Sequence, residues 1–259
     1  MHAFLIGGGA GSPAAHRPFA DAALAAGAKV GPPGAARPAR PVVVYLLDEP
    51  DGEEPDRDRW IEELRAVGLD RGEVVVVSPD RPPAVDDLDG AAGVYVAGGW
   101  TPGYRDVLVD GGTDWLEPVR TGSVPYAGFS AGSSIAAEHA LVGGWRVERN
   151  GRAVAVCHED VGEDLDLLTI GPGLAVVPFL VDVHAAQWGT LHRLVHALSI
   201  PGTPDVGWAI DEATALEVVD GVPVAVHGEG AATRVGRVDS AGGTVEVTVV
   251  TAGESLPPA

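Results

Sequence analysis

A serine within a Gly-x-Ser-x-Gly pentapeptide is the first residue whose surroundings suggest chemistry. The segment PYAGFSAGSSIAAEH spans residues 125–139, and Ser130 lies where a short β-prone run meets a string of very small residues. A serine hydroxyl is a poor nucleophile until a base takes its proton and donors stabilise the oxyanion. A sharp strand-to-helix turn exposes the hydroxyl, and glycines on both sides allow that strained turn to pack. Ser130 is therefore a candidate nucleophile, and a purely structural corner is the alternative.

A nucleophilic serine needs a base, and the chain has eight histidines. His184 follows the apolar run LAVVPFLV and precedes a helical segment, so it is expected at the end of a strand. Active sites gather at the carboxyl edge of α/β sheets, which makes His184 a candidate base. A core or helix-capping histidine is the alternative. Four others occur near the terminus or in unpatterned stretches, which indicates the surface: His2, His16, His139 and His158.

Two further histidines raise the question of a metal. His192 and His196 are four residues apart on an expected helix. No glutamate is placed as in His-Glu-x-x-His, so a polar helix flank is preferred and no metal or organic cofactor is predicted. Lys29 is the single lysine, and it fits neither a Schiff-base site nor a P-loop.

Alternating apolar and helical segments indicate the elements that must position these residues. Continuous apolar strands separated by helices are typical of a parallel sheet covered on both faces. Strands are predicted at 3–8, 42–47, 73–78, 93–99 and 125–130, and helices at 18–28, 57–67 and 103–120. Loops are predicted at 31–41 and 48–58. Beyond residue 205 the pattern changes to short strands and turns, so 205–251 is predicted as a strand-rich extension of one α/β domain covering 1–259.

Composition and charge exclude several function classes. The formal net charge of −20 disfavours binding to nucleic acid and to anionic membranes. No apolar window is long enough for a membrane span, and the N-terminal segment lacks the features of a signal peptide. A single cysteine, Cys157, favours a reducing, cytoplasmic location. A homodimer is a possibility that the sequence leaves open.

Four segments together resemble a known family. YAGFSAGSSIA, VPFLVDVHAAQWGTLHRLV and VGWAIDEATALEV are similar to the signature segments of the dipeptidase E / cyanophycinase family of serine peptidases, and VYVAGGWTPGYRDVL is similar to its oxyanion loop. The resemblance covers about 42–235 in the family's order. It implies a flavodoxin-like three-layer α/β sandwich, the class I glutamine amidotransferase-like fold, with a mostly parallel central sheet and additional C-terminal strands.

The resemblance also implies roles for individual residues. Ser130 matches the nucleophile, His184 the base and Glu212 the acid, and the backbone N–H groups of Gly99 and Ala131 match the oxyanion hole. A carboxylate in this role fixes the imidazole tautomer and stabilises its cation. The competing acids are Asp182, Asp211 and, near the nucleophile in sequence, Glu148.

The chain departs from the family pattern where the substrate is expected. Trp188 and Thr190 replace two arginines of the family's motif, and Trp100 stands where Asn or Asp is usual. The expected substrate-binding residues are Trp100, Val183, Trp188 and Arg193. The resemblance implies recognition of an aspartyl carboxylate, which needs positive charge in the pocket. Because two arginines are replaced and only Arg193 and Arg105 remain as cations expected in reach, the prediction is a serine hydrolase of small peptides or amides that turns over aspartyl substrates poorly.

Other functions remain as alternatives. A glutamine amidotransferase would need cysteine and a His-x-Glu pair, whereas positions 130 and 186 are serine and alanine. An α/β-hydrolase esterase would need the order Ser, acid, His, which Ser130, Asp205 or Asp211, and His227 satisfy. The segment GAGSPA (9–14) fits a nucleotide-binding loop, but no acid follows about 20 residues later. A catalytically inactive binding protein is the last alternative.

Overall fold

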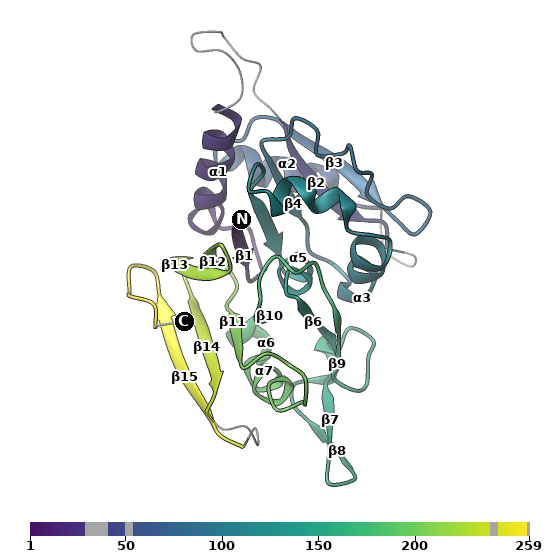
Figure 1. The fold of residues 1–259 in the computed structure, drawn as a ribbon, viewed down its shortest axis with the longest axis vertical. Coiled ribbons are helices and arrows are strands. Elements are labelled where there is room, and N and C mark those ends of the chain that lie inside the picture. The colour runs from purple at the N-terminus through teal and green to yellow at the C-terminus, as the bar shows by residue number, and fades with distance from the viewer. Residues whose placement is uncertain (29–40, 50–53, 239–242, 258–259) are drawn as a thin grey trace.

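A computed structural model describes residues 1–28, 41–49, 54–238 and 243–257 (Figure 1). Two predicted loops fall partly outside the described residues: the loop 31–41, of which only Pro41 is described, and part of the loop 48–58. Lys29 also lies outside them. No helix among the described residues is long and apolar enough to cross a membrane.

A seven-stranded sheet forms the centre of the molecule, in the order β13-β12-β1-β5-β4-β2-β3. Five strands run parallel, and the β12–β13 hairpin extends the β1 edge in the antiparallel sense. All five strands predicted in the first half of the chain form, so the predicted α/β class is confirmed. Their bounds are β1 (His2–Ile6), β2 (Val42–Leu47), β3 (Gly72–Val77), β4 (Gly93–Val96) and β5 (Tyr126–Phe129), followed by β12 (Thr214–Val219) and β13 (Val222–Gly228).

Helices cover both faces of this sheet. On one face, α1 (Pro13–Ala28) contacts α2 (Arg57–Ala66), and Trp60 of α2 packs on Tyr95 of β4 with ring centroids 5.6 Å apart. Tyr45, on the neighbouring strand and the opposite face, packs on Trp115 at 5.0 Å. The predicted helix 103–120 is several short pieces: α3 (Thr101–Arg105), η1 (Asp106–Asp110), η2 (Asp114–Leu116) and α4 (Glu117–Arg120). With α5 (Ala131–Ile135), which contacts α3, they belong to the second helical layer.

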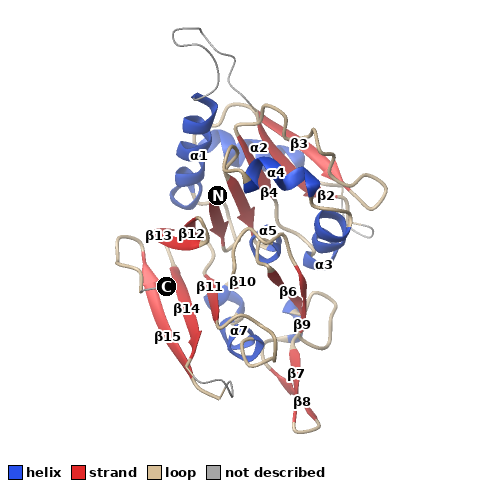
Figure 2. Cartoon of the chain, in the orientation of Figure 1, coloured by secondary structure: helices blue, strands red, loops and turns tan. Residues whose placement is uncertain are grey.

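The second half of the chain adds another sheet at the carboxyl ends of the parallel strands. Its order is β10-β11-β14-β15, and β10 and β11 are parallel. Figure 2 shows helices concentrated around the central sheet and mostly strands and loops in the lower half of the view. The remaining bounds are β6 (His139–Gly143), β7 (Arg146–Arg149), β8 (Arg152–Ala155), η3 (Glu159–Val161), β9 (Thr169–Pro172), β10 (Leu180–Val183), α6 (Ala185–Trp188), α7 (Leu191–Ala197), β11 (Val206–Ile210), β14 (Ala231–Arg237) and β15 (Val245–Thr251).

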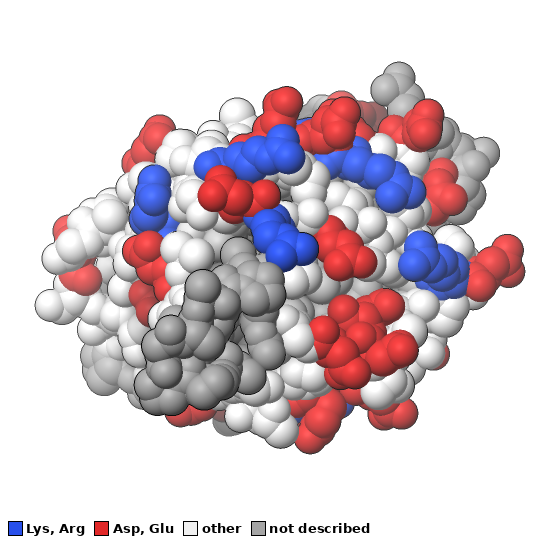
Figure 3. Space-filling view, turned by 90° about the horizontal axis from the view of Figure 1, so that it is seen from above, with Lys and Arg blue, Asp and Glu red and all other residues white. Residues whose placement is uncertain are grey.

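The strands predicted after residue 205 divide between the two sheets. The β12–β13 hairpin continues the central sheet, whereas β11, β14 and β15 belong to the second one. One hydrophobic cluster joins them, since it contains Leu5 of the central sheet and Trp208 and Val250 of the second. On the face seen in Figure 3, acidic side chains lie among the basic ones.

Candidate active site

Ser130 occupies a sharp turn between β5 and α5. Its φ of 51° lies in the left-handed region, which a side-chain-bearing residue rarely adopts, and its N–H donates to Ile6 O at 2.9 Å. A Cβ added at Gly128 would lie 2.4 Å from Gly132 O, and one added at Gly132 would lie 2.3 Å from Val96 O. Only glycine fits at either position. The Gly-x-Ser-x-Gly motif therefore forms a strand–turn–helix elbow that presents the serine side chain at the sheet edge.

His184 and Glu212 meet this serine in a hydrogen-bonded chain. Ser130 Oγ lies 2.7 Å from His184 Nε2, and His184 Nδ1 lies 2.7 Å from Glu212 Oε1. A carboxylate accepts only, so Nδ1 carries the proton and Nε2 is free to accept from the serine hydroxyl. Glu212, in the β11–β12 loop, donates its own N–H to Gln187 Oε1 at 3.0 Å. Three segments distant in sequence thus converge on one proton path.

The three glycines after β1 pack directly against His184 and Glu212. Gly8 and Gly9 have φ of +98° and +87°, and Cβ atoms there would lie 2.2 Å from His184 Cε1 and 2.6 Å from Glu212 Oε2. His184 N–H donates to Gly7 O at 3.0 Å. Sequence reasoning considered this loop only for nucleotide binding and missed its positioning role. The available signal was three consecutive glycines at the end of a buried strand.

The surroundings of His184 favour its neutral form. Burial lowers the pKa of the imidazole, and the hydrogen bond and charge of Glu212 oppose that shift. Trp188 covers the ring in a parallel stack, with centroids 3.6 Å apart and planes 5° apart. A neutral imidazole can act as a base, so these contacts suit proton abstraction from Ser130.

The predicted oxyanion donors adjoin the nucleophile. A Cβ at Gly98 would lie 3.1 Å from Ser130 Cβ, so the loop containing Gly99 passes close to the serine. Within the described part of the chain, neither the Gly99 nor the Ala131 N–H donates to a protein acceptor. Trp100 N–H, one residue on, is already engaged by Glu49 Oε1 at 2.8 Å. Both N–H groups are thus available to a substrate oxygen, and their role as oxyanion donors stays a prediction.

A cleft of about 560 Å³ opens above the serine. Both predicted tryptophans, Trp100 and Trp188, line it. It is also lined by four acids and by one arginine: Asp160, Glu163, Asp164, Glu212 and Arg59. Burial raises the pKa of the Glu163 carboxyl, and hydrogen bonds from Thr101 oppose the shift.

Two of the predicted substrate residues do not line this cleft. Arg193 is buried behind its wall in a bidentate pair with Asp182, at 2.9 and 2.7 Å, and also donates to Val161 O. Val183 is buried within β10. Neither residue therefore contacts the cleft, and both expectations are corrected. The Arg193 guanidinium, on an apolar helix face, is instead paired with the acid buried beside it.

The arginine that lines the cleft is not the one that the sequence suggested. Arg105 pairs with Asp106 and Asp110 and does not line the cleft. Arg59, which sequence reasoning missed, lines it from α2 and pairs with Glu63 at 3.0 Å. No motif marks Arg59, because its helix reaches the cleft only through the layered packing.

The competing acids and bases have other partners. Asp211 accepts from the N–H groups of Ala186 and Ala231, and Glu148 is exposed on the β7–β8 hairpin. His227 pairs with Glu217 and Asp205 with Arg237, so the esterase arrangement is not assembled. His16, expected at the surface, is instead buried, with Nε2 2.9 Å from Tyr95 Oη.

The histidine pair on α7 has no further metal-ligating neighbours. The His192 and His196 rings lie 4.6 Å apart. Among the described residues, no group of three or more His, Cys, Asp or Glu side chains could hold a metal ion.

Comparisons with known proteins place the fold. No protein-family model and no curated protein matches the sequence. A peptidase from an acI-B1 Actinobacterium is similar in structure, with a TM-score of 0.62 and 18% identity over 98% of this chain and 96% of the other. A candidate peptidase E from Listeria monocytogenes EGD-e has a TM-score of 0.53 and 15% identity over 88% of this chain and 98% of the other. The chain therefore has the flavodoxin-like α/β fold of these peptidase E-like structures.

Proposed function

We propose that this protein is a serine hydrolase that cleaves small peptides or amides through an acyl-enzyme on Ser130. One observation carries the proposal: Ser130, His184 and Glu212 are joined by two hydrogen bonds of 2.7 Å on a nucleophile elbow. The peptidases of similar fold support peptide hydrolysis in general. These preassembled hydrogen bonds argue against an inactive binding protein.

In the acylation step, Ser130 Oγ attacks the carbonyl carbon while its proton passes to His184 Nε2. The carbonyl π electrons move to oxygen, and the Gly99 and Ala131 N–H groups stabilise that oxyanion. Glu212 stabilises the imidazolium through Nδ1–H. The imidazolium then protonates the leaving amine as the C–N bond breaks, which leaves an ester on Ser130.

Deacylation repeats these roles with water. His184 removes a proton from a water molecule as the water oxygen attacks the ester carbonyl. The same N–H groups stabilise the second oxyanion. The proton returns to Ser130 Oγ as the C–O bond breaks. The carboxylic acid product then leaves, and the resting hydrogen bonds are restored.

A fluorophosphonate probe tests the nucleophile directly. The probe should label Ser130, and Ser130→Ala should abolish labelling and lower peptide turnover on the order of 10³–10⁶-fold. Ser123→Ala is the matched control. Ser123 is exposed and its hydroxyl donates a hydrogen bond to Pro118 O, so its removal should leave labelling and turnover unchanged. Undiminished turnover by Ser130→Ala would disprove the proposal.

A further inference from the structure

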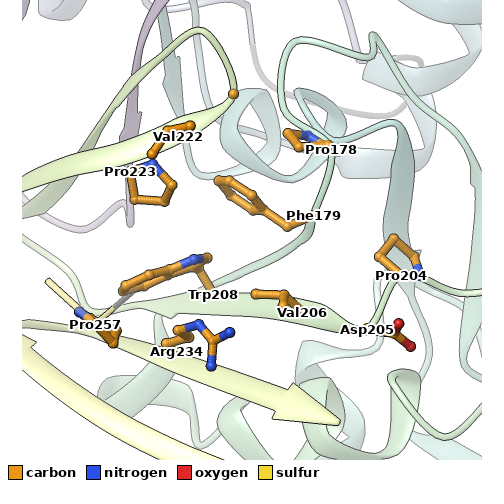
Figure 4. A pocket seen from close by; sticks show the side chains of 11 residues that line it. Pro178, Phe179, Pro204, Asp205, Val206, Trp208, Val222, Pro223, Arg234 and Pro257 are labelled. Atoms are coloured by element: carbon orange, nitrogen blue, oxygen red, sulfur yellow. The ribbon is translucent and has the colours of Figure 1, made fainter. Parts of the chain in front are cut away.

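A second cavity lies between the two sheets, away from the catalytic serine (Figure 4). It has a volume of about 250 Å³ and shares no lining residue with the active-site cleft. Its walls come from the segment before β10, the start of β11, the β12–β13 turn, β14 and the C-terminal segment. Most are apolar: Pro178, Phe179, Pro204, Val222, Pro223 and Pro257.

Two hydrogen-bond donors lie side by side on one wall. Trp208 of β11 and Arg234 of β14 are paired directly in the antiparallel ladder, so their side chains project from the same face of the sheet. Figure 4 shows them opposite Phe179 and Pro223. A Cβ added at Gly236 would lie 2.7 Å from Arg234 Nη1, so the guanidinium occupies space left by this glycine.

Neither donor has a partner in the described part of the chain. Trp208 is 2% exposed, yet within the described residues its indole N–H donates to no protein acceptor, and the Arg234 guanidinium makes no hydrogen bond or ion pair. Among the described residues, the indole nitrogen of Trp208 is not one of the fully enclosed side-chain atoms that lack a hydrogen bond, so it is not sealed off from the cavity that Trp208 lines. Buried tryptophan N–H groups normally have a partner.

The neighbouring charges leave Arg234 uncompensated. Asp205 also lines the cavity, but its largely exposed carboxylate pairs with Arg237 Nε at 3.1 Å. Arg193, which is buried, is by contrast neutralised by Asp182. Arg234 thus presents a free planar fork of donors, the geometry that binds a carboxylate.

We propose that this cavity binds a small monocarboxylate with an apolar body. The carboxylate would accept hydrogen bonds from Arg234 and from the indole N–H of Trp208, while the body packs against Phe179 and the prolines. The volume lies below the roughly 300–1,000 Å³ of drug-sized ligand sites, which suits one aromatic ring or one branched chain. The apolar walls disfavour a phosphate, whose other oxygens would lack partners. The proposal does not depend on the hydrolase activity.

Titration with phenylacetate and with 4-methylpentanoate tests this site. The Trp208 indole ¹H–¹⁵N signal, identified by its loss in Trp208→Phe, should shift saturably with millimolar ligand. Phenylacetamide, which has the same shape without the charge, should bind more weakly. Arg234→Gln should weaken phenylacetate binding about tenfold or more, since it removes a charged hydrogen bond.

Two control variants test whether phenylacetate binds at this cavity and not elsewhere on the protein. Ser130→Ala should bind phenylacetate as the parent protein does, because the catalytic serine lies in the other cleft. Arg146→Gln, which changes an exposed arginine on the β7–β8 hairpin, should also leave binding unchanged. Circular dichroism establishes that each variant is folded. Absence of saturable binding of both carboxylates to the parent protein, or unchanged binding by folded Arg234→Gln, would overturn the proposal.

Discussion

Trp188 stacks on His184 with ring centroids 3.6 Å apart and planes 5° apart, and Gly8 lies so close to the imidazole that an added Cβ would be 2.2 Å from Cε1. The ring is thereby in contact with both an indole face and the backbone of the glycine loop. Trp188 itself is 43% exposed, so its outer face remains open to the cleft. A residue expected to bind substrate therefore also covers the candidate base.

Removing this stack should change the pH dependence of activity. In the proposed mechanism the neutral imidazole is the base, so kcat/KM should fall as the pH drops through the pKa of His184, which burial holds below its ordinary value. Trp188→Ala exposes the ring, raises this pKa and moves the acid limb of the profile to higher pH. Trp188→Phe should largely restore it. A shift to lower pH in Trp188→Ala would mean that the indole chiefly stabilises the imidazolium.

Glu212 should matter far more than the alternative acid. Glu212→Gln keeps a similar shape but cannot stabilise the imidazolium as a carboxylate does, so kcat should fall on the order of 10³–10⁴-fold. Glu148→Gln is the control, because Glu148 is exposed on a hairpin. Steady-state kinetics of both variants decide between the two acids. The reverse ranking would assign the catalytic acid to Glu148.

Gly8→Ala should disable the enzyme without unfolding it. The added methyl would lie 2.2 Å from His184 Cε1, and displacing a catalytic group by about 1 Å can cost on the order of 10²-fold in rate. Gly112→Ala is a matched control: its φ of +106° is similar, but a Cβ there meets nothing within 4 Å. Both variants carry the backbone strain, and only Gly8→Ala should lose activity. Equal activity of the two would remove Gly8 from the site.

The charge of the cleft should disfavour acidic substrates. Asp160, Glu163 and Asp164 line it, whereas its one lining cation among the described residues, Arg59, already pairs with Glu63. We expect kcat/KM to be higher for leucyl and alanyl p-nitroanilides than for the aspartyl compound under one condition. An aspartyl preference that Arg59→Gln abolishes would show that Arg59 recognises the substrate carboxylate.

Arg193 should contribute to stability and not to specificity. Arg193→Gln leaves the fully buried Asp182 without its counter-charge, which should lower the free energy of unfolding by about 3–5 kcal/mol. Arg146→Gln breaks an exposed pair and should cost about 0–1 kcal/mol. Denaturant unfolding measures both. An unchanged stability together with an altered ratio of aspartyl to leucyl turnover would return Arg193 to the substrate site.

Local patterns were sufficient for the core of the fold and for the sharp turn at Ser130. The five parallel strands follow from continuous apolar runs between helical segments, because a strand buried on both faces has no polar side. The elbow at Ser130 follows from its two glycines, since the contacts that exclude a Cβ lie within the motif and the adjoining strand. The assignment of Glu212 depended on the family resemblance, because no spacing rule separates it from Asp211.

The tertiary structure alone decided what surrounds these groups. It brings Gly8 against His184, carries Arg59 into the cleft and buries Arg193 with Asp182. It also divides the C-terminal strands between two sheets, which creates the cavity at Arg234. Residue type and local spacing determine which element forms and which groups it carries. The burial and the partners of a charged side chain depend on segments far away in sequence, and those are set only when the layers pack.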